Sequence, residues 1–189
     1  MESGDKIRFF FEANSFDEQD QLKHSKHDCL NKIGHSLHWH DPVFKKITFN
    51  DRVKNVAKDL DFKDPAVVQG MYIFKQPRIG TPVTPHQDGT FLFNDPLKLV
   101  GLWYPIDDAT LENGCLWYVP GSHKLPIKSR FKRSPENKMV FEGKDHEMND
   151  EDWVAAPVKK GTARILTTFK SIYKMCIGTS TIFESFLSF

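Results

Sequence analysis

The residues best suited to chemistry are His86 and Asp88, which one residue separates in His86-Gln87-Asp88. We expect an extended strand here, and residues two apart on a strand point to the same face. An imidazole and a carboxylate could then reach one metal ion. A His from a distant strand would complete the two-His-one-carboxylate triad of non-haem iron(II) sites, which leaves positions open for a co-substrate and O₂. The spacing alone is common, and a strand-end His and Asp could instead bond to a turn.

Three further histidines, His35, His38 and His40, lie close together. The pair Asp41-Pro42 follows directly, and a capping side chain before a proline is typical of a helix start. We therefore interpret these histidines as part of a loop and helix entrance rather than as metal ligands. His123 follows a Pro-Gly turn, and we expect it to fix that turn or to bound a pocket. No phosphate-binding loop, Gly-rich dinucleotide fingerprint or Ser-His-Asp triad is present.

The elements that position these residues change in character near Pro65. Before it we expect an edge strand within Asp5–Phe16, a polar loop and two helices, one of them with an apolar stripe at helical spacing. After it come short apolar runs at roughly ten-residue spacing, bounded by turn residues, which predict a double-sheet jelly roll. The expected strands are Val67–Gln76, His86–Phe93, Lys98–Ile106, Gly114–Pro120 and Val158–Leu166. The charged stretch Lys128–Asp152 is interpreted as a surface insertion.

The composition argues against a nucleic-acid-binding protein and against a disulfide-stabilised one. Lys and Arg number 26 and Asp and Glu 25 in 189 residues, so the net charge is +1 and nothing favours nucleic acid as a partner. Three cysteines without CxxC spacing argue against a disulfide framework or zinc site, which suggests a reducing, intracellular and cytoplasmic setting. The N-terminal residues lack a signal-peptide core, and the apolar C-terminal run is too polar to predict a membrane span.

Several separate segments, in the same order, resemble the phytanoyl-CoA dioxygenase family. The resemblance extends from about Ser3 to about Leu166. The matching segments are Ser3–Glu12 (SGDKIRFFFE), Asn31–Phe44 (NKIGHSLHWHDPVF), Met71–Pro77 (MYIFKQP), Pro85–Leu92 (PHQDGTFL) and Ala109–His123 (ATLENGCLWYVPGSH). This resemblance implies a mainly β, α+β protein: a double-stranded β-helix, or jelly roll, flanked by N-terminal helices.

The resemblance also implies a site and its cofactors. His86 and Asp88 match the iron ligands of the family, so Fe(2+), 2-oxoglutarate as co-substrate and O₂ are the implied cofactors. The positions that match the lining of the 2-oxoglutarate site are Lys32, Met71, Gln87 and Trp103, together with the two iron ligands. A flexible ammonium group at Lys32 suits a dicarboxylate, although a solvated lysine is the ordinary alternative. The implied activity is hydroxylation of a small molecule, which could be an acyl-CoA or another lipid-like compound.

The chain departs from the family pattern towards its C-terminus. The family places an iron-binding His on a late strand and an Arg soon after, but no His follows His146 and no Arg follows Arg164. We therefore expect a partial domain over residues 1–166, a divergent tail over 167–189 and a jelly roll incomplete at both ends, as in a truncated or alternative isoform with impaired catalysis. The alternatives are an inactive isoform that binds 2-oxoglutarate or a partner, and a cupin-type metalloenzyme.

Overall fold

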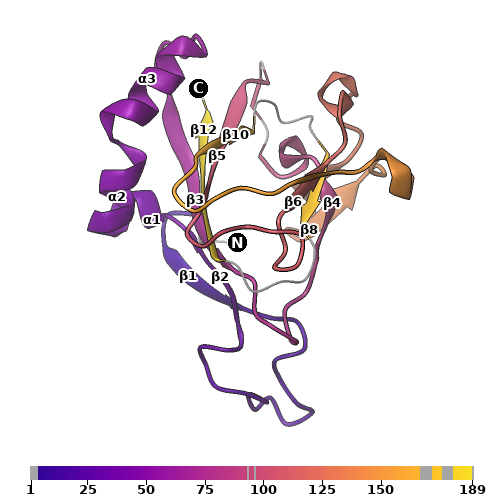
Figure 1. The fold of residues 1–189 in the computed structure, drawn as a ribbon. Helices are drawn as coiled ribbons and strands as arrows, with labels where there is room; N and C mark the ends of the chain where they lie inside the picture. Colours follow the sequence, from indigo (N-terminus) through magenta and orange to yellow (C-terminus); the bar gives the residue numbers. More distant parts are fainter. Residues whose placement is uncertain (1–3, 93, 96, 167–171, 176–180, 189) are drawn as a thin grey trace.

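The computed structural model describes residues 4–92, 94–95, 97–166, 172–175 and 181–188, the last range by its backbone only. Two β-sheets lie against each other, and the helices cover the outer side of the larger sheet (Figure 1). The predicted fold class, a mainly β jelly roll with N-terminal helices, is confirmed. The strands are β1 (Ile7–Phe11), β2 (Leu30–His35), β3 (Ala66–Phe74), β4 (Val83–His86), β5 (Leu99–Pro105), β6 (Leu116–Tyr118), β7 (Arg130–Arg133), β8 (Met139–Glu142), β9 (Val154–Ala156), β10 (Arg164–Leu166), β11 (Tyr173–Met175) and β12 (Thr181–Ser188). The helices are α1 (Leu37–His40), α2 (Pro42–Thr48) and α3 (Asp51–Asp59), with short 3-10 turns η1 (Asp88–Thr90), η2 (Ser122–Lys124) and η3 (Asp150–Asp152).

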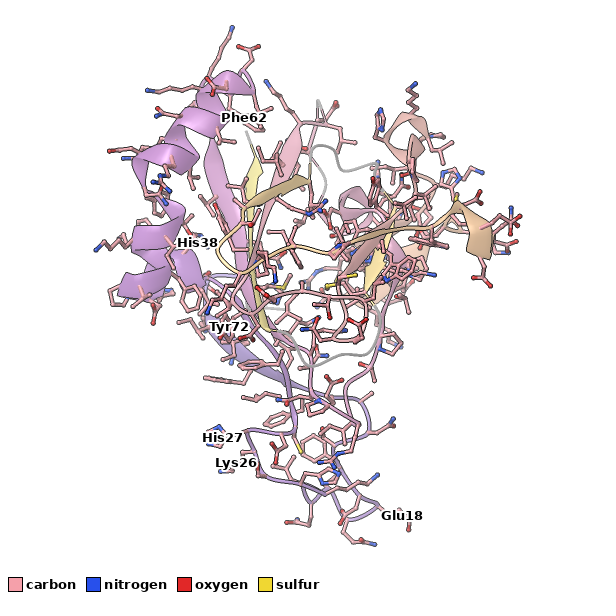
Figure 2. All side chains as sticks on the ribbon, viewed as in Figure 1. Glu18, Lys26, His27, His38, Phe62 and Tyr72 are labelled. Atoms are coloured by element: carbon pink, nitrogen blue, oxygen red, sulfur yellow. The ribbon has the colours of Figure 1, made fainter. Side chains whose placement is uncertain are left out.

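The larger sheet has the strand order β1-β2-β3-β12-β5-β10 in the described part of the chain. Its outer face is covered by α3 and the turn after it, where Val53, Ala57 and Phe62 pack against Val100 and Leu102 of β5. Phe62 is labelled at this helical layer in Figure 2. Burying this apolar stripe is the main source of stability for so short a helix, because an isolated helix of this length is marginal in water.

Two side-chain caps fix where the helices begin. The Asp41 carboxylate accepts from the backbone N–H groups of Val43 and Phe44, at 2.9 and 3.1 Å, directly before Pro42. Asn50 caps α3 in the same way. Each such cap stabilises a helix by about 1 kcal/mol. The helix start predicted at Asp41-Pro42 is therefore confirmed, together with the apolar stripe of the next helix.

The smaller sheet has the order β4-β11-β6-β9, again for the described residues. The core between the sheets joins residues of both. Its buried members are Ile73, Trp103, Ala109, Cys115, Leu116, Ala156, Tyr173 and Met175. None of the helices in the described ranges has the length and hydropathy needed to cross a bilayer. The polar loop between β1 and β2, which carries Glu18, Lys26 and His27, extends away from both sheets (Figure 2).

A turn after His86, a hairpin in the charged insertion and an additional strand near the N-terminus differ from the sequence-based expectations. The strand expected over His86–Phe93 ends at His86, because the backbone turns into η1 at Asp88-Gly89. The Asp88 carbonyl stabilises this turn by accepting hydrogen bonds from the backbone amides of Phe91 and Leu92. The insertion contains an antiparallel hairpin, β7–β8, rather than irregular chain alone. The segment Leu30–His35, for which no strand was predicted, is strand β2 because it pairs on both sides, with β1 and β3.

The tail also differs from expectation in its described residues. No strand was predicted in the tail, but β11 lies between β4 and β6, and β12 lies between β3 and β5 (Figure 1). The tail backbone thus takes interior positions in both sheets. Residues 167–171, where the family pattern predicts the approach to a distal His, lie outside the described residues. That the tail is divergent in sequence stays a prediction.

Candidate metal and co-substrate site

The pair His86 and Asp88 lies where β4 ends and η1 begins. His86 Nε2 is 3.7 Å from Asp88 Oδ1, and their side chains are 17% and 9% exposed. The turn brings the two groups together, so the same-face argument for a continuous strand does not apply. Nowhere in the described ranges do three or more His, Cys, Asp or Glu side chains lie close enough together to hold a metal ion. The pair therefore contributes two donors, and a metal needs at least one more from elsewhere.

The backbone of β4 fixes the proton on the His86 ring. His86 Nδ1 lies 2.8 Å from the carbonyl oxygen of Thr84. A carbonyl oxygen can only accept, so Nδ1 donates, and in the neutral ring the lone pair is then on Nε2. A backbone carbonyl on the far nitrogen is the usual support of a metal-binding histidine. Nε2 is thus the nitrogen that faces Asp88 and the one able to bind a cation.

Tyr173 of β11 completes this cluster. Its hydroxyl donates a hydrogen bond to Asp88 Oδ1, and its ring centroid lies 4.5 Å from that of His86. Tyr173 is 3% exposed and Asp88 7%. Tyr173 and His86 are also backbone partners across β11 and β4. Sequence reasoning missed Tyr173, because nothing in the local sequence pairs it with a strand so far along the chain.

The cluster is enclosed on its outer side by the insertion. Residues lining a small gap there include His86, Gln87, Asp145, His146 and Ile172, and the gap is too narrow to hold a water molecule. His146 is held by its Nε2, 2.8 Å from the carbonyl of Pro126. Gln87, predicted to line the co-substrate site, is 2% exposed.

The other predicted co-substrate residues lie on the larger sheet. Met71 and Trp103 both pair with Glu184 of the intervening strand β12, and directly opposed residues project to the same face of a sheet. Trp103 belongs to the core between the sheets and Met71 packs against it, so this is the inner face. Trp103 is 0% exposed, and its Nε1 has no hydrogen-bond partner among the described residues. A buried donor of this kind suits an acceptor-only ligand such as a carboxylate.

Two cations share this inner face at opposite ends. Lys32 pairs with Ile73, two residues from Met71, and its Nζ lies 5.7 Å from the centroid of the Phe10 ring. Arg164 pairs with Trp103 from the edge strand β10. Four strand steps separate β2 from β10, which is about 19 Å at the usual strand spacing. Lys32 and Arg164 therefore start from opposite sides of the sheet, and we treat each as a separate candidate for holding a dicarboxylate.

Aromatic side chains gather beside the His86 ring. Phe91 lies with its ring centroid 5.6 Å from His86, and the rings of Phe131 and Phe141 follow at 5.7 and 5.9 Å from Phe91. Phe91 is 44% and Phe141 58% exposed. Arg130 secures this hairpin to η1 through a 2.7 Å hydrogen bond to the Gly89 carbonyl. The insertion therefore places an exposed aromatic cluster next to the candidate metal site.

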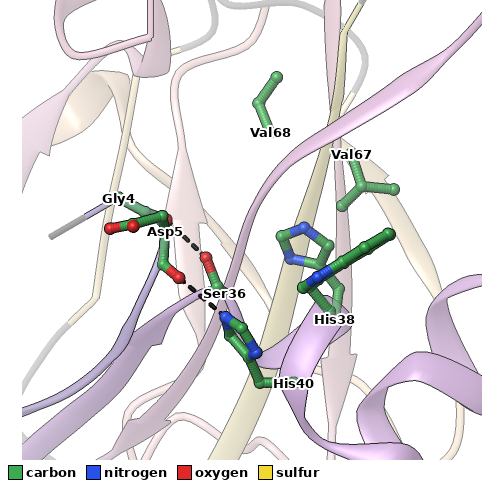
Figure 3. Close-up of a pocket in the computed structure, with 8 residues that line it drawn as sticks. Gly4, Asp5, Ser36, His38, His40, Val67 and Val68 are labelled. Carbon is green, nitrogen blue, oxygen red and sulfur yellow. Dashed lines mark hydrogen bonds between the residues drawn. The ribbon is translucent and has the colours of Figure 1, made fainter.

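His38 and His40 line a separate surface hollow of about 520 Å³ (Figure 3). His40 Nε2 lies 2.8 Å from the Asp5 carbonyl, and Ser36 donates to the Gly4 carbonyl. His38 is buried in the wall, and that burial, with the nearby His40, lowers its pKa below the ordinary value of 6.5. The partner of His40 is thus a backbone carbonyl, while His35 Nδ1 accepts from the Gln69 side-chain amide at 2.7 Å and His38 Nδ1 has no partner among the described residues. The helix entrance is as interpreted, but the expected loop is absent, since His35 ends β2 and His38 and His40 lie in α1.

A jelly roll with a His and an Asp at the end of a strand of the smaller sheet is the arrangement typical of non-haem iron oxygenases. The chain belongs to the phytanoyl-CoA dioxygenase (PhyH) family, whose sequence model matches residues 1–166. It is 46% identical, over 182 residues, to phytanoyl-CoA dioxygenase domain-containing protein 1 of Danio rerio, covering 94% of this chain and 62% of that protein. The resemblance seen in the sequence is thereby confirmed. The chain spans about three fifths of the length of such relatives.

Solved structures of low sequence identity share the fold. The non-heme alpha ketoglutarate dependent epimerase SnoN from nogalamycin biosynthesis matches with a TM-score of 0.66 and 14% identity, covering 95% of this chain and 66% of that one. EvdO2 from Micromonospora carbonacea var. aurantiaca, solved with 2-oxoglutarate, matches with a TM-score of 0.61 and 20% identity, covering 95% and 76%. At these identities the comparison establishes the jelly roll and leaves the chemistry to the residues.

Proposed function

We propose that this chain carries the iron- and 2-oxoglutarate-binding site of a dioxygenase that hydroxylates a small molecule, with His86 and Asp88 as metal ligands. The observation that carries the proposal is the 3.7 Å approach of His86 Nε2 to Asp88 Oδ1 beside the inner face of the larger sheet. Membership of the PhyH family supports it. Nitrogen and carboxylate donors together suit iron(II), and the Thr84 carbonyl holds His86 in the ligating tautomer.

The inner face of the larger sheet supports a site for the co-substrate. 2-Oxoglutarate is a dianion that only accepts hydrogen bonds. Trp103 Nε1, a buried donor without a partner among the described residues, and the Lys32 ammonium both suit it, while Met71 supplies an apolar wall. Gln87, between the two metal ligands in sequence, contributes an amide. Lys32 is preferred over Arg164 because its position matches the lining of the co-substrate site in the family.

The protein residues position and enclose the reactants. When bound, iron and 2-oxoglutarate would supply the oxidation, in which O₂ converts the co-substrate to succinate and CO₂ and hydroxylates a C–H bond. His86 and Asp88 hold the metal, Lys32 and Trp103 orient the dicarboxylate, and the buried core around Trp103 excludes water. The proton of His86 stays on Nδ1, against the Thr84 carbonyl.

The aromatic cluster supports an apolar, lipid-like substrate, of which an acyl-CoA is one example. Phe91 and Phe141 present exposed apolar surface next to His86, and the half-buried Phe131 packs against both. Burial of such rings is among the larger contributions to binding. Arg133 of the same hairpin is exposed and would meet an anionic head group, while Lys132, also exposed, is ion-paired with Glu142.

The second candidate is a protein that binds 2-oxoglutarate without turnover. A specific observation favours it: β11 presents Tyr173, and not a His, opposite His86. Under this alternative the chain binds iron and co-substrate but releases little CO₂.

Calorimetric titration of 2-oxoglutarate into the 189-residue chain, with Fe(II) under anaerobic conditions, tests the shared part of both candidates. We expect binding that His86→Ala abolishes and that Asp95→Ala, which removes an exposed carboxylate, leaves unchanged. Release of labelled CO₂ with Fe(II), ascorbate and O₂ then separates them. Turnover above the His86→Ala background supports the dioxygenase, and binding without turnover supports the second candidate. Absence of iron-dependent binding would contradict both.

A further inference from the structure

Strand β11 brings a third potential metal donor to His86 and Asp88. It lies beside β4 in the smaller sheet, and Tyr173 is the direct backbone partner of His86. Directly opposed residues of antiparallel strands project to the same face. The sheet itself therefore aims the Tyr173 side chain at the pair, and the contact does not depend on a flexible loop.

The side chains converge on one carboxylate oxygen. Asp88 Oδ1 accepts the hydrogen bond from the Tyr173 hydroxyl and is also the atom 3.7 Å from His86 Nε2. The rings of Tyr173 and His86 lie with centroids 4.5 Å apart. Tyr173 is 3% exposed, so its hydroxyl is kept at this point by packing in the core between the sheets. One nitrogen and two oxygen donors thus meet at a single buried place.

The spacing of these donors suits a metal ion. Neighbouring ligands of an octahedral ion are about 3 Å apart when each metal–ligand distance is about 2.1 Å. The His86–Asp88 separation needs to shorten slightly, and the contact between Tyr173 and Asp88 needs to lengthen. A phenolate oxygen is an established iron ligand, as in the tyrosine-ligated haem of catalase.

We propose that Tyr173 is the third protein ligand of this site, so that iron is held by His86, Asp88 and Tyr173 rather than by two histidines and a carboxylate. This inference rests on the proposed iron site at His86 and Asp88. Binding replaces the O–H bond of Tyr173 with an oxygen–iron bond, and the proton leaves to solvent, as for any ligand that binds a metal in its deprotonated form. Two anionic oxygen ligands favour iron(III) over iron(II), because iron(III) carries the higher charge. A phenolate bound to iron(III) absorbs visible light, so this complex is coloured.

The test uses iron(III) added as its nitrilotriacetate complex to the 189-residue chain, followed by desalting. We expect retained iron and a visible phenolate-to-iron(III) charge-transfer band, with phenolate vibrations in the resonance Raman spectrum. Tyr173→Phe, which keeps the ring beside His86, should lose the band and bind iron at least about tenfold more weakly. Tyr104→Phe is the matched control, because Tyr104 packs with the helical layer on the outer face of the larger sheet, away from His86. It should keep both the band and the affinity.

The outcomes separate this inference from the proposed function. Iron retained in a His86-dependent way without the band, or a band that survives Tyr173→Phe, overturns the tyrosine ligand and leaves the site at His86 and Asp88 in place. Tighter iron binding by Tyr173→Phe also overturns it, since Tyr173 would then obstruct the site. No iron retained at all overturns both proposals. Ring-deuterated tyrosine in the unaltered chain must shift the phenolate vibrations, a check that needs no folded variant.

Discussion

The hydroxyl of Tyr173 donates a hydrogen bond to the carboxylate of Asp88 across a sequence separation of 85 residues. This contact joins β11 to the turn η1 in the buried region between the sheets, next to His86. A carboxylate in that position has two consequences. It is a donor for a cation when one is bound, and in the metal-free chain it is the acceptor that satisfies a buried hydroxyl.

Asp88→Ala should therefore reduce stability as well as metal binding. The change leaves the buried Tyr173 hydroxyl without this acceptor, at a cost of about 1–3 kcal/mol in the free energy of unfolding. Asp88→Asn keeps an acceptor oxygen and should cost less, while still weakening iron binding. Urea unfolding of the metal-free variants measures the first effect, with Asp95→Ala as the exposed control. Equal stability of Asp88→Ala and the parent chain would show that the hydrogen bond contributes nothing.

Phe141→Ala should weaken the binding of an apolar ligand without altering iron binding. Its ring is 58% exposed, so removal should change stability by less than about 0.5 kcal/mol. Losing part of the apolar contact should weaken the free energy of binding by about 1 kcal/mol. This corresponds to roughly a fivefold loss of affinity for a fluorescent fatty acid. Phe9→Ala, with 61% exposure on β1, is the matched control. If both variants bind the fatty acid alike, the aromatic cluster is not the substrate surface.

The jelly roll could be predicted because most of its strands are apolar runs bounded by polar or turn residues in the sequence. The run that became β3, for example, is apolar and ends in Lys75-Gln76-Pro77, and β5 is bounded by polar and turn residues. Strand β2 could not be predicted, because Leu30 and Ile33 are its only apolar residues, do not alternate along the strand, and become part of a strand through pairing with β1 and β3. Such strands depend on context more than on intrinsic preference.

The candidate site could be predicted only in part. His86 and Asp88 are close in sequence, and their contact depends on a turn of a few residues. Tyr173 and Arg164 depend on which strands lie side by side, and no local pattern sets that order. The roles of Lys32, Met71, Gln87 and Trp103 stay predictions, since their support is the family pattern and their placement near the inner face.

His38 should make the protein less stable in mild acid. Burial, with the nearby His40 as a smaller cause, lowers the pKa of His38 below 6.5. Below that value the unfolded chain binds a proton that the folded chain resists, so stability is full above about pH 6.5 and falls as pH decreases towards the lowered pKa. His38→Gln, which cannot titrate, should lose less stability between about pH 7.5 and about pH 5.5 in urea unfolding. His24→Gln, in the exposed loop, should behave like the parent. An unchanged acid slope in His38→Gln would remove His38 as the cause.

Lys32 and Arg164 are alternative cations for the co-substrate, because about four strand steps separate them along the inner face. Lys32→Ala should weaken 2-oxoglutarate binding by about fivefold, the worth of an accessible charge pair of about 1 kcal/mol. Arg164→Gln should leave the affinity unchanged if Lys32 is the partner. Lys46→Ala, an exposed lysine of α2, controls for the loss of one positive charge. Calorimetry with Fe(II) present measures all of these variants. A loss confined to Arg164→Gln would instead move the dicarboxylate towards β10, beside Trp103, and would contradict the role of Lys32 carried over from the family pattern.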